Sequence, residues 1–172
     1  MKKIILTAII FCCTSISLFA QDHSGHKNMA STSTTDTSGN SNLSQLLTEY
    51  YHIKDALVAG NANTAAASAE TFVKTANSID YKVISEGNIN ALVKDATSIS
   101  ETKDIKKQRE QFANLSNNMI ALAKAMKLGE QPIYETYCPM KKAYWLSNSK
   151  TIKNPYFGSF MLTCGKVTET IQ

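Results

Sequence analysis

Apolar side chains recur every three or four residues in four successive segments between residues 43 and 129, and this spacing predicts amphipathic α-helices. The first segment ends at Gly60, where a helix is expected to stop, and Ser85 is placed to cap the third. The fourth has the clearest spacing and is followed by Gly129, a second expected stop. The apolar stripes consist of Leu43, Leu46, Leu47, Tyr50, Ile53 and Leu57; of Ala65, Ala69, Phe72, Ala76 and Ile79; of Ile89, Leu92, Val93 and Ala96; and of Ile105, Phe112, Leu115, Met119, Leu122 and Met126.

Four amphipathic helices with short connections predict a mainly α fold, an antiparallel four-helix bundle over residues 43–129. Beyond this range the pattern changes to a short alternation over residues 133–137, which is typical of a strand. Asn154-Pro155 and Phe157-Gly158 are turn sequences. We therefore expect residues 130–172 to form a small irregular cap with short strands, folded against one end of the bundle as part of the same domain.

The N-terminus has the features of a signal peptide over residues 1–20. Lys2 and Lys3 precede an apolar core, and Ala20 is followed by polar sequence. Cys12 raises the alternative of a lipoprotein, but a bulky phenylalanine precedes it, so we favour cleavage after Ala20. Residues 21–42 contain few apolar side chains and are expected to be a disordered polar tail. The sequence thus predicts an exported, periplasmic protein with no transmembrane segment in its mature chain.

The charge balance and the motifs exclude several classes of function. Removal of residues 1–20 lowers the formal net charge from +4 to +2, which gives no reason to expect nucleic acid or anionic lipid as a partner. The sequence has no nucleophile elbow, no glycine-rich phosphate loop and no HExxH motif. The cysteines left after cleavage lack the CxxC spacing of thiol oxidoreductases. We therefore expect that the protein is not an enzyme.

The candidate chemistry lies in two cysteine–methionine pairs within the last 35 residues. Cys138 is followed by Met140, and Met161 precedes Cys164 by three positions. Thiolate and thioether sulfurs are soft ligands that select Cu(I), whereas zinc favours imidazole or additional thiolates. These four residues are therefore the predicted ligands of Cu(I) or Ag(I).

A disulfide between Cys138 and Cys164 is the alternative. They are the two cysteines that remain after cleavage, and an exported protein occupies a compartment that permits disulfides. Closing a loop of about 27 residues would stabilise the fold by roughly 3 kcal/mol in the chain-entropy model. A disulfide leaves the two neighbouring methionines unexplained, and the sequence alone does not decide between the two states.

The histidines provide weaker candidates for metal ligands. His52 lies in the first predicted helix, where a surface role is the more common one. Cleavage after Ala20 would place His23 third from a free amine, an arrangement that can hold Cu(II) in a square plane of four nitrogens, with His26 just beyond. The alternative for both N-terminal histidines is a solvated tail without metal.

The C-terminal motifs resemble the DUF3347 domain of exported Bacteroidetes proteins. The resemblance rests on Tyr-x-x-x-Cys-Pro-Met, Tyr-Trp-Leu-Ser, Ile-x-Asn-Pro-Tyr-Phe-Gly and Met-Leu-Thr-Cys-Gly, at residues 134–140, 144–147, 152–158 and 161–165. The helical segments 54–57 and 108–112 also fit, so the resemblance extends from about residue 43 to the end of the cap. It implies a helical domain that occurs alone or attached to adaptor subunits of heavy-metal efflux pumps.

A second similarity is local. Residues 137–140 are similar to the Tyr-x-Cys-Pro-Met-His-Pro element of heavy-metal-binding domains in copper transport proteins, but Lys141 stands where that element has histidine. Two hypotheses follow. The first is a periplasmic protein that binds or delivers Cu(I) or Ag(I) in heavy-metal efflux or copper homeostasis. The second is a disulfide-stapled helical module that docks on an efflux adaptor or another envelope protein without metal.

Overall fold

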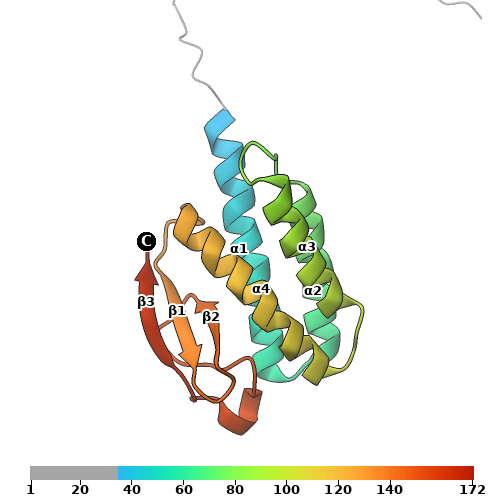
Figure 1. The fold of residues 1–172 in the computed structure, drawn as a ribbon, viewed down its shortest axis with the longest axis vertical. Helices are drawn as coiled ribbons and strands as arrows, with labels where there is room; N and C mark the ends of the chain where they lie inside the picture. Colours follow the sequence, from blue (N-terminus) through green and yellow to red (C-terminus); the bar gives the residue numbers. More distant parts are fainter. Residues whose placement is uncertain (1–34) are drawn as a thin grey trace, which may run out of the picture. The chain divides into compact units, whose positions relative to one another are not determined.

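The computed structural model describes the backbone of residues 35–172 and the side chains from residue 41 onward. Within this range four α-helices are followed by a small antiparallel sheet (Figure 1). This confirms the predicted mainly α fold with a cap of short strands. The elements are α1 Thr35–Ala59, α2 Ala62–Asn77, α3 Glu86–Ser100, α4 Ile105–Ala125, β1 Ile133–Cys138, β2 Ala143–Ser147, the 3-10 helix η1 Gly158–Met161 and β3 Lys166–Ile171.

The first helix begins earlier than its apolar stripe. Helix α1 starts at Thr35, so residues 35–42, which the composition assigned to the polar tail, are helical. Polar residues at the start of a helix carry no periodic signal, and for this reason the pattern placed the boundary at residue 43. The predicted signal peptide and the remainder of the tail lie outside the described residues.

The ends of the helices follow the expected turn chemistry only in part. Gly60 follows α1 with a φ of +72°, as predicted for a glycine that ends a helix. Ser85 is the N-cap of α3, but its side chain makes no capping hydrogen bond. At the start of the next helix, α4, Asp104 does cap through its side chain, which accepts from the Lys106 N–H at 2.9 Å. Helix α4 ends at Ala125, four residues before the predicted stop at Gly129.

Each helix packs against the next one in the chain, and all four contribute to one apolar core. Helix α2 presents mainly alanines to this core, and these short side chains let α1 and α3 approach it closely. Phe112 of α4 stacks on Tyr50 of α1 with ring centroids 5.2 Å apart. No helix within residues 35–172 is long and apolar enough to cross a membrane.

The sheet has the strand order β2-β1-β3, and both neighbouring pairs are antiparallel. Strand β2 lies beside α4, β3 lies farthest from the helices, and η1 lies near the C-terminal end of α1 (Figure 1). An ion cluster joins the sheet to the bundle, because Lys124 Nζ of α4 lies 2.6 Å from a Glu135 carboxylate oxygen and 2.8 Å from one of Glu169.

Two tyrosine hydroxyls hydrogen-bond to the backbone of β2. The Leu146 N–H donates to the buried Tyr50 hydroxyl of α1 at 3.1 Å, and the Tyr156 hydroxyl donates to the Tyr144 carbonyl. Tyr50 is also bonded to Ser116 Oγ of α4 at 2.8 Å. Buried backbone groups without partners cost free energy, so these hydroxyls satisfy the strand where it enters the core. They also fix the position of the sheet on the bundle.

Candidate functional site

The fold brings the two cysteines of the cap together. Cys138 is the last residue of β1, and Cys164 lies in the short connection between η1 and β3. Their sulfur atoms are 4.0 Å apart although the residues are separated by 26 positions. Neither forms a disulfide in this structure; Cys138 is fully buried, and Cys164 is partly exposed. A pair of adjacent thiols with one accessible member therefore lies at the end of the central strand β1.

The turn after β1 directs two backbone N–H groups toward these sulfurs. Pro139 leads the chain out of the strand, and the turn closes when the Lys142 N–H donates to the Cys138 carbonyl at 2.8 Å. Lys142 adopts a φ of +55°, the left-handed conformation that this reversal requires. Within the turn the Lys141 N–H donates to Cys138 Sγ at 3.4 Å, and the Met140 N–H donates to Cys164 Sγ. The Cys-Pro-Met-Lys-Lys sequence thus provides one of the two thiols and a backbone hydrogen-bond donor for each of the two sulfurs.

Asn154 completes the surroundings of the pair from the other side. It is fully buried, and its Nδ2 donates to Cys138 Sγ at 3.2 Å and to the Cys164 carbonyl at 2.7 Å. Its Oδ1 accepts from the N–H groups of Tyr156 and Phe157 at 2.8 and 3.3 Å. One amide side chain therefore uses both its donor and its acceptor to hold the sulfur pair and the following turn together.

The surroundings of Cys164 influence its protonation. Desolvation raises the pKa of the Cys164 thiol above its ordinary value, and the adjacent Cys138 sulfur raises it further. The Met140 N–H acts in the opposite direction, because a hydrogen bond to sulfur favours the thiolate. Cys138 Sγ, for its part, accepts hydrogen bonds from two N–H donors, those of Lys141 and Asn154. This arrangement can bind a soft cation or lose two hydrogens to an oxidant.

The two predicted methionines lie at the surface beside this pair. Met140 is 62% exposed and Met161 is 38% exposed. Their backbones touch Cys164, because the Met140 N–H donates to its sulfur and the Met161 carbonyl accepts from its N–H at 3.0 Å. The structure therefore brings both methionines into the immediate neighbourhood of the cysteines and leaves their thioethers open to solvent.

The histidines do not join the cysteines in the described part of the chain. Among residues 35–172 no group of three or more His, Cys, Asp or Glu side chains is arranged to hold a metal. His52 is exposed on α1, where its Nδ1 lies 3.1 Å from a Glu49 carboxylate oxygen. His23 and His26 lie outside the described residues. The sulfur atoms alone carry the soft-ligand chemistry of the cap.

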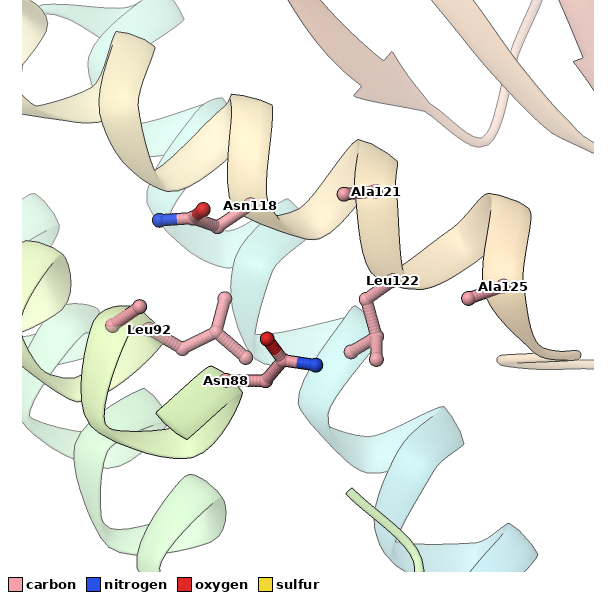
Figure 2. A pocket seen from close by; sticks show the side chains of 7 residues that line it. Asn88, Leu92, Asn118, Ala121, Leu122 and Ala125 are labelled. Atoms are coloured by element: carbon pink, nitrogen blue, oxygen red, sulfur yellow. The ribbon is translucent and has the colours of Figure 1, made fainter. Parts of the chain in front are cut away.

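A small pocket in the bundle offers no comparable chemistry. It has a volume of about 100 Å³ and lies between α3 and α4 (Figure 2). Figure 2 shows Asn88 and Leu92 of α3 across the pocket from α4, which contributes Leu122. Asn118 of α4 lies at the end of the pocket opposite Ala125. Asn118 Nδ2 donates to an Asp95 carboxylate oxygen at 2.7 Å. The lining has no charged side chain, so we interpret this gap as a packing defect between two helices.

The sequence pattern identified the cysteines but missed Asn154. In the sequence this residue reads only as half of an Asn-Pro turn, and such turns are common. Its role depends on two segments, residues 138–141 and 164, that are distant in the chain and that only the folded cap brings to it. The one available signal was its position within the Ile-x-Asn-Pro-Tyr-Phe-Gly motif.

Comparison with known proteins supplies one match. The family model described as "Protein of unknown function (DUF3347)" matches residues 46–131. This range begins within α1 and ends two residues before the start of β1. The matched range spans the four helices and ends before both cysteines of the cap. No curated protein and no solved structure matched the chain in these comparisons.

Proposed function

The chain belongs to the DUF3347 family, and we propose that it binds Cu(I) or Ag(I) through the sulfur atoms of Cys138 and Cys164. The observation that carries this proposal is the 4.0 Å separation of the two sulfurs across 26 residues of chain. Each sulfur also accepts at least one backbone N–H. We infer a binding role and no catalytic one.

The donor set fits a soft monovalent ion. Thiolates prefer Cu(I), and both Cu(I) and Ag(I) accept coordination by two sulfurs. Zinc sites are almost always four-coordinate, and no His, Asp or Glu side chain within residues 35–172 adds to the cysteine pair. N–H groups directed at sulfur stabilise the negative charge that a bound cation requires of its ligands. A pair of this kind therefore favours soft, low-coordinate ions over divalent ones.

Met140 and Met161 extend the donor set at the surface. Their side chains are exposed, and their backbones contact the partly exposed Cys164, so we infer that the thioethers can reach an ion that arrives at this thiol. Thioethers are weaker ligands than thiolates, so they suit capture and exchange better than permanent storage. We infer that the protein binds and delivers the ion, and that Cys138 and Cys164 hold it more tightly than the methionines do.

The proposed setting is the periplasm, in heavy-metal efflux or copper homeostasis. It rests on the signal-peptide features of residues 1–20 and on the resemblance to domains attached to efflux adaptors. The partner in this proposal is an efflux adaptor or another envelope transport protein. The predicted Cu(II) site at a processed N-terminus, with His23, would be a second and separate metal site.

The same pair of thiols supports a second candidate, a disulfide-stapled module that docks on an envelope protein without metal. Sulfurs in hydrogen-bond contact need only a small movement to form a bond, and the reaction transfers two electrons and two protons to an external disulfide or quinone oxidant. The mass of protein isolated from its native envelope without reductant distinguishes the candidates. A deficit of two hydrogens supports the disulfide, and an added metal mass supports the metal site.

The metal proposal is tested by anaerobic competition of the full chain against a chromophoric Cu(I) chelator. Cys164→Ser should reduce the Cu(I) affinity by at least tenfold, because a hydroxyl is a hard and neutral donor. The partly exposed position of Cys164 makes this substitution tolerable for folding, and circular dichroism checks the helices. Met140→Leu and Met161→Leu should weaken binding by less, because they remove thioethers only.

Met126→Leu is the matched control, since this methionine lies at the end of α4 and packs against the bundle core. It should bind Cu(I) as the wild type does. Equal affinity of the wild type and Cys164→Ser would overturn the proposal. A loss of the same size in Met126→Leu would show that the substitutions act through the fold and would also count against it.

A further inference from the structure

Helix α1 carries a buried lysine that neither the sulfur pair nor the core explains. Only 4% of the Lys54 side chain is exposed. Its Nζ lies 3.0 Å from an Asp55 carboxylate oxygen and 5.3 Å from the centroid of the Tyr51 ring. Lysine is almost never buried without a full set of partners, because a charge taken out of water loses its hydration. The surroundings of this ammonium must therefore compensate its charge.

The two contacts leave the Lys54 ammonium incompletely satisfied. An ammonium has three N–H donors, and the Asp55 oxygen accepts one of them. Asp55 is itself 57% exposed, so solvent screens its charge and weakens the attraction. The ring of Tyr51 attracts the cation electrostatically, but its face accepts no conventional hydrogen bond from the ammonium. Two donors of this buried charge thus have no protein partner among the described residues, and Lys54 lines an open space.

That space is a pocket of about 360 Å³ between the C-terminal half of α1 and the segment that follows β2. Its polar lining includes a second lysine, Lys153, and one carboxylate, that of Asp55. The remaining wall consists of hydroxyl and amide side chains. The complete lining is Lys54, Asp55, Ser147, Asn148, Ser149, Thr151 and Lys153.

The hydroxyl wall is held in place by its own hydrogen bonds. The Ser149 N–H donates to Ser147 Oγ at 3.1 Å, and the Thr151 N–H donates to Ser149 Oγ at 3.1 Å. The segment therefore keeps a fixed path past the buried ammonium. Two positive charges against one exposed carboxylate give the pocket a net positive charge.

We propose that this pocket binds a small oxyanion, a phosphate or a carboxylate group, between Lys54 and Lys153. The anion would accept the two remaining N–H donors of Lys54 and so compensate the buried charge. Lys153 would contribute a second ammonium, and the hydroxyls of Ser149 and Thr151 would donate to the remaining oxygens, since the Ser147 hydroxyl already donates to the Ser149 carbonyl at 2.9 Å. The inference is independent of the proposed metal site, because it uses none of the sulfur atoms.

The test is an NMR titration of the metal-free full chain, with the amide signals of the segment after β2 as the readout. The probes are inorganic phosphate and acetate, each added at constant ionic strength against chloride. A saturable shift of the Ser149 and Thr151 amides is expected with one or both probes. A response to phosphate alone identifies a phosphate-type ligand, and a response to acetate identifies a carboxylate. No saturable shift with either probe would overturn the proposal.

Substitutions show whether the lysines are responsible. Lys54→Met keeps the length of the side chain, removes its charge and should weaken the anion affinity at least tenfold. Lys153 is exposed, so Lys153→Met does not endanger folding. This substitution should weaken the anion affinity by about threefold or more. Lys150→Met is the matched control, because this lysine belongs to the same segment but lies over the Tyr134 ring and does not line the pocket. Equal losses of anion affinity in all three variants would show that binding depends only on the overall positive charge of the segment. That result would count against the site.

Discussion

Asn154 donates a hydrogen bond from its side-chain amide to Cys138 Sγ at 3.2 Å, and this contact makes a turn residue part of the thiol site. The same amide holds the Cys164 carbonyl at 2.7 Å, so one side chain fixes both cysteine segments. Asn154 is fully buried, so it makes these contacts away from bulk solvent. The state of the sulfur pair therefore depends on a residue that carries no soft-ligand chemistry of its own.

Asn154→Asp is expected to weaken Cu(I) binding by tenfold or more. The substitution keeps the oxygen that accepts from Tyr156 and Phe157 but replaces the donor to Cys138 with a second carboxylate oxygen. A carboxylate beside a thiolate disfavours the negative charge that a metal ligand needs. Competition against a chromophoric chelator measures the loss. Asn148→Asp, in an exposed position six residues earlier, adds the same charge away from the sulfurs and should leave the affinity unchanged.

Gly158 is expected to tolerate no side chain. Its φ is +57°, and a Cβ atom would lie 2.5 Å from Arg109 Nη2 and 3.0 Å from the Val58 carbonyl oxygen. The Arg109 guanidinium cannot easily move away, because its Nη2 donates to the Leu57 carbonyl at 2.9 Å. Gly158→Ala should therefore lower the free energy of unfolding by about 2–4 kcal/mol, as the sum of left-handed strain and a steric clash. Urea denaturation measures the change.

Gly60→Ala separates the two causes. Gly60 has a similar φ of +72°, but nothing lies within 4 Å of its hypothetical Cβ. Its substitution should cost only the backbone strain, about 1–2 kcal/mol. If both variants lost the same stability, the close approach of Arg109 to Gly158 would contribute nothing, and the expected steric clash in the Phe-Gly turn would be disproved.

The sequence predicted the helical bundle because its signal is local. In α2 and α4 the apolar positions that define the stripes, from Ala65 to Ala76 and from Phe112 to Leu122, are the ones that the structure buries. The start of α1 was missed because residues 35–42 are polar and lack a periodic pattern. The end of α4 was placed too late, because Met126 leaves the helix with an extended backbone before the glycine is reached.

The candidate site was predictable only in its ligand types. Cys138 and Cys164 could be paired from their number, but nothing in the spacing indicated that Cys138 would be buried and Cys164 accessible. The role of Asn154 and the oxyanion pocket around Lys54 depend on contacts between distant segments. Lys54 illustrates the difficulty, because a lysine in an amphipathic helix reads as a solvated residue until its side chain is found to be 4% exposed.

Tyr50→Phe is expected to loosen the sheet from the bundle. The substitution removes the hydroxyl that accepts from the buried Leu146 N–H and that is bonded to Ser116 Oγ, and it leaves both groups without this partner. An unsatisfied buried donor costs about 1–3 kcal/mol, so the loss of unfolding free energy should fall in that range. Hydrogen exchange should increase at the Leu146 amide in particular. Tyr81→Phe, at a tyrosine that is 61% exposed, is the control and should change neither quantity.

Asp95→Asn is expected to stabilise the protein at neutral pH and to flatten part of its stability profile. Desolvation raises the pKa of Asp95 above its ordinary value of 3.8. The hydrogen bond from Asn118 and the charge of Lys94 lower the pKa, but by less than desolvation raises it. A carboxyl whose pKa is raised by folding favours the folded state most when it is protonated, so this contribution is present below pH 3.8 and is lost as the pH rises through the raised pKa. Asparagine imitates the protonated form and can still accept from Asn118, so the variant should lack this loss. The gain at pH 7 should stay below about 1 kcal/mol, because the carboxyl is partly exposed and screened.

Asn118→Ala should have the opposite effect, since it removes a hydrogen bond that stabilises the charged carboxylate. Thermal unfolding between pH 3 and 8 measures both, and a steeper loss of stability with pH in Asp95→Asn than in the wild type would show that the assigned direction of the pKa shift is wrong.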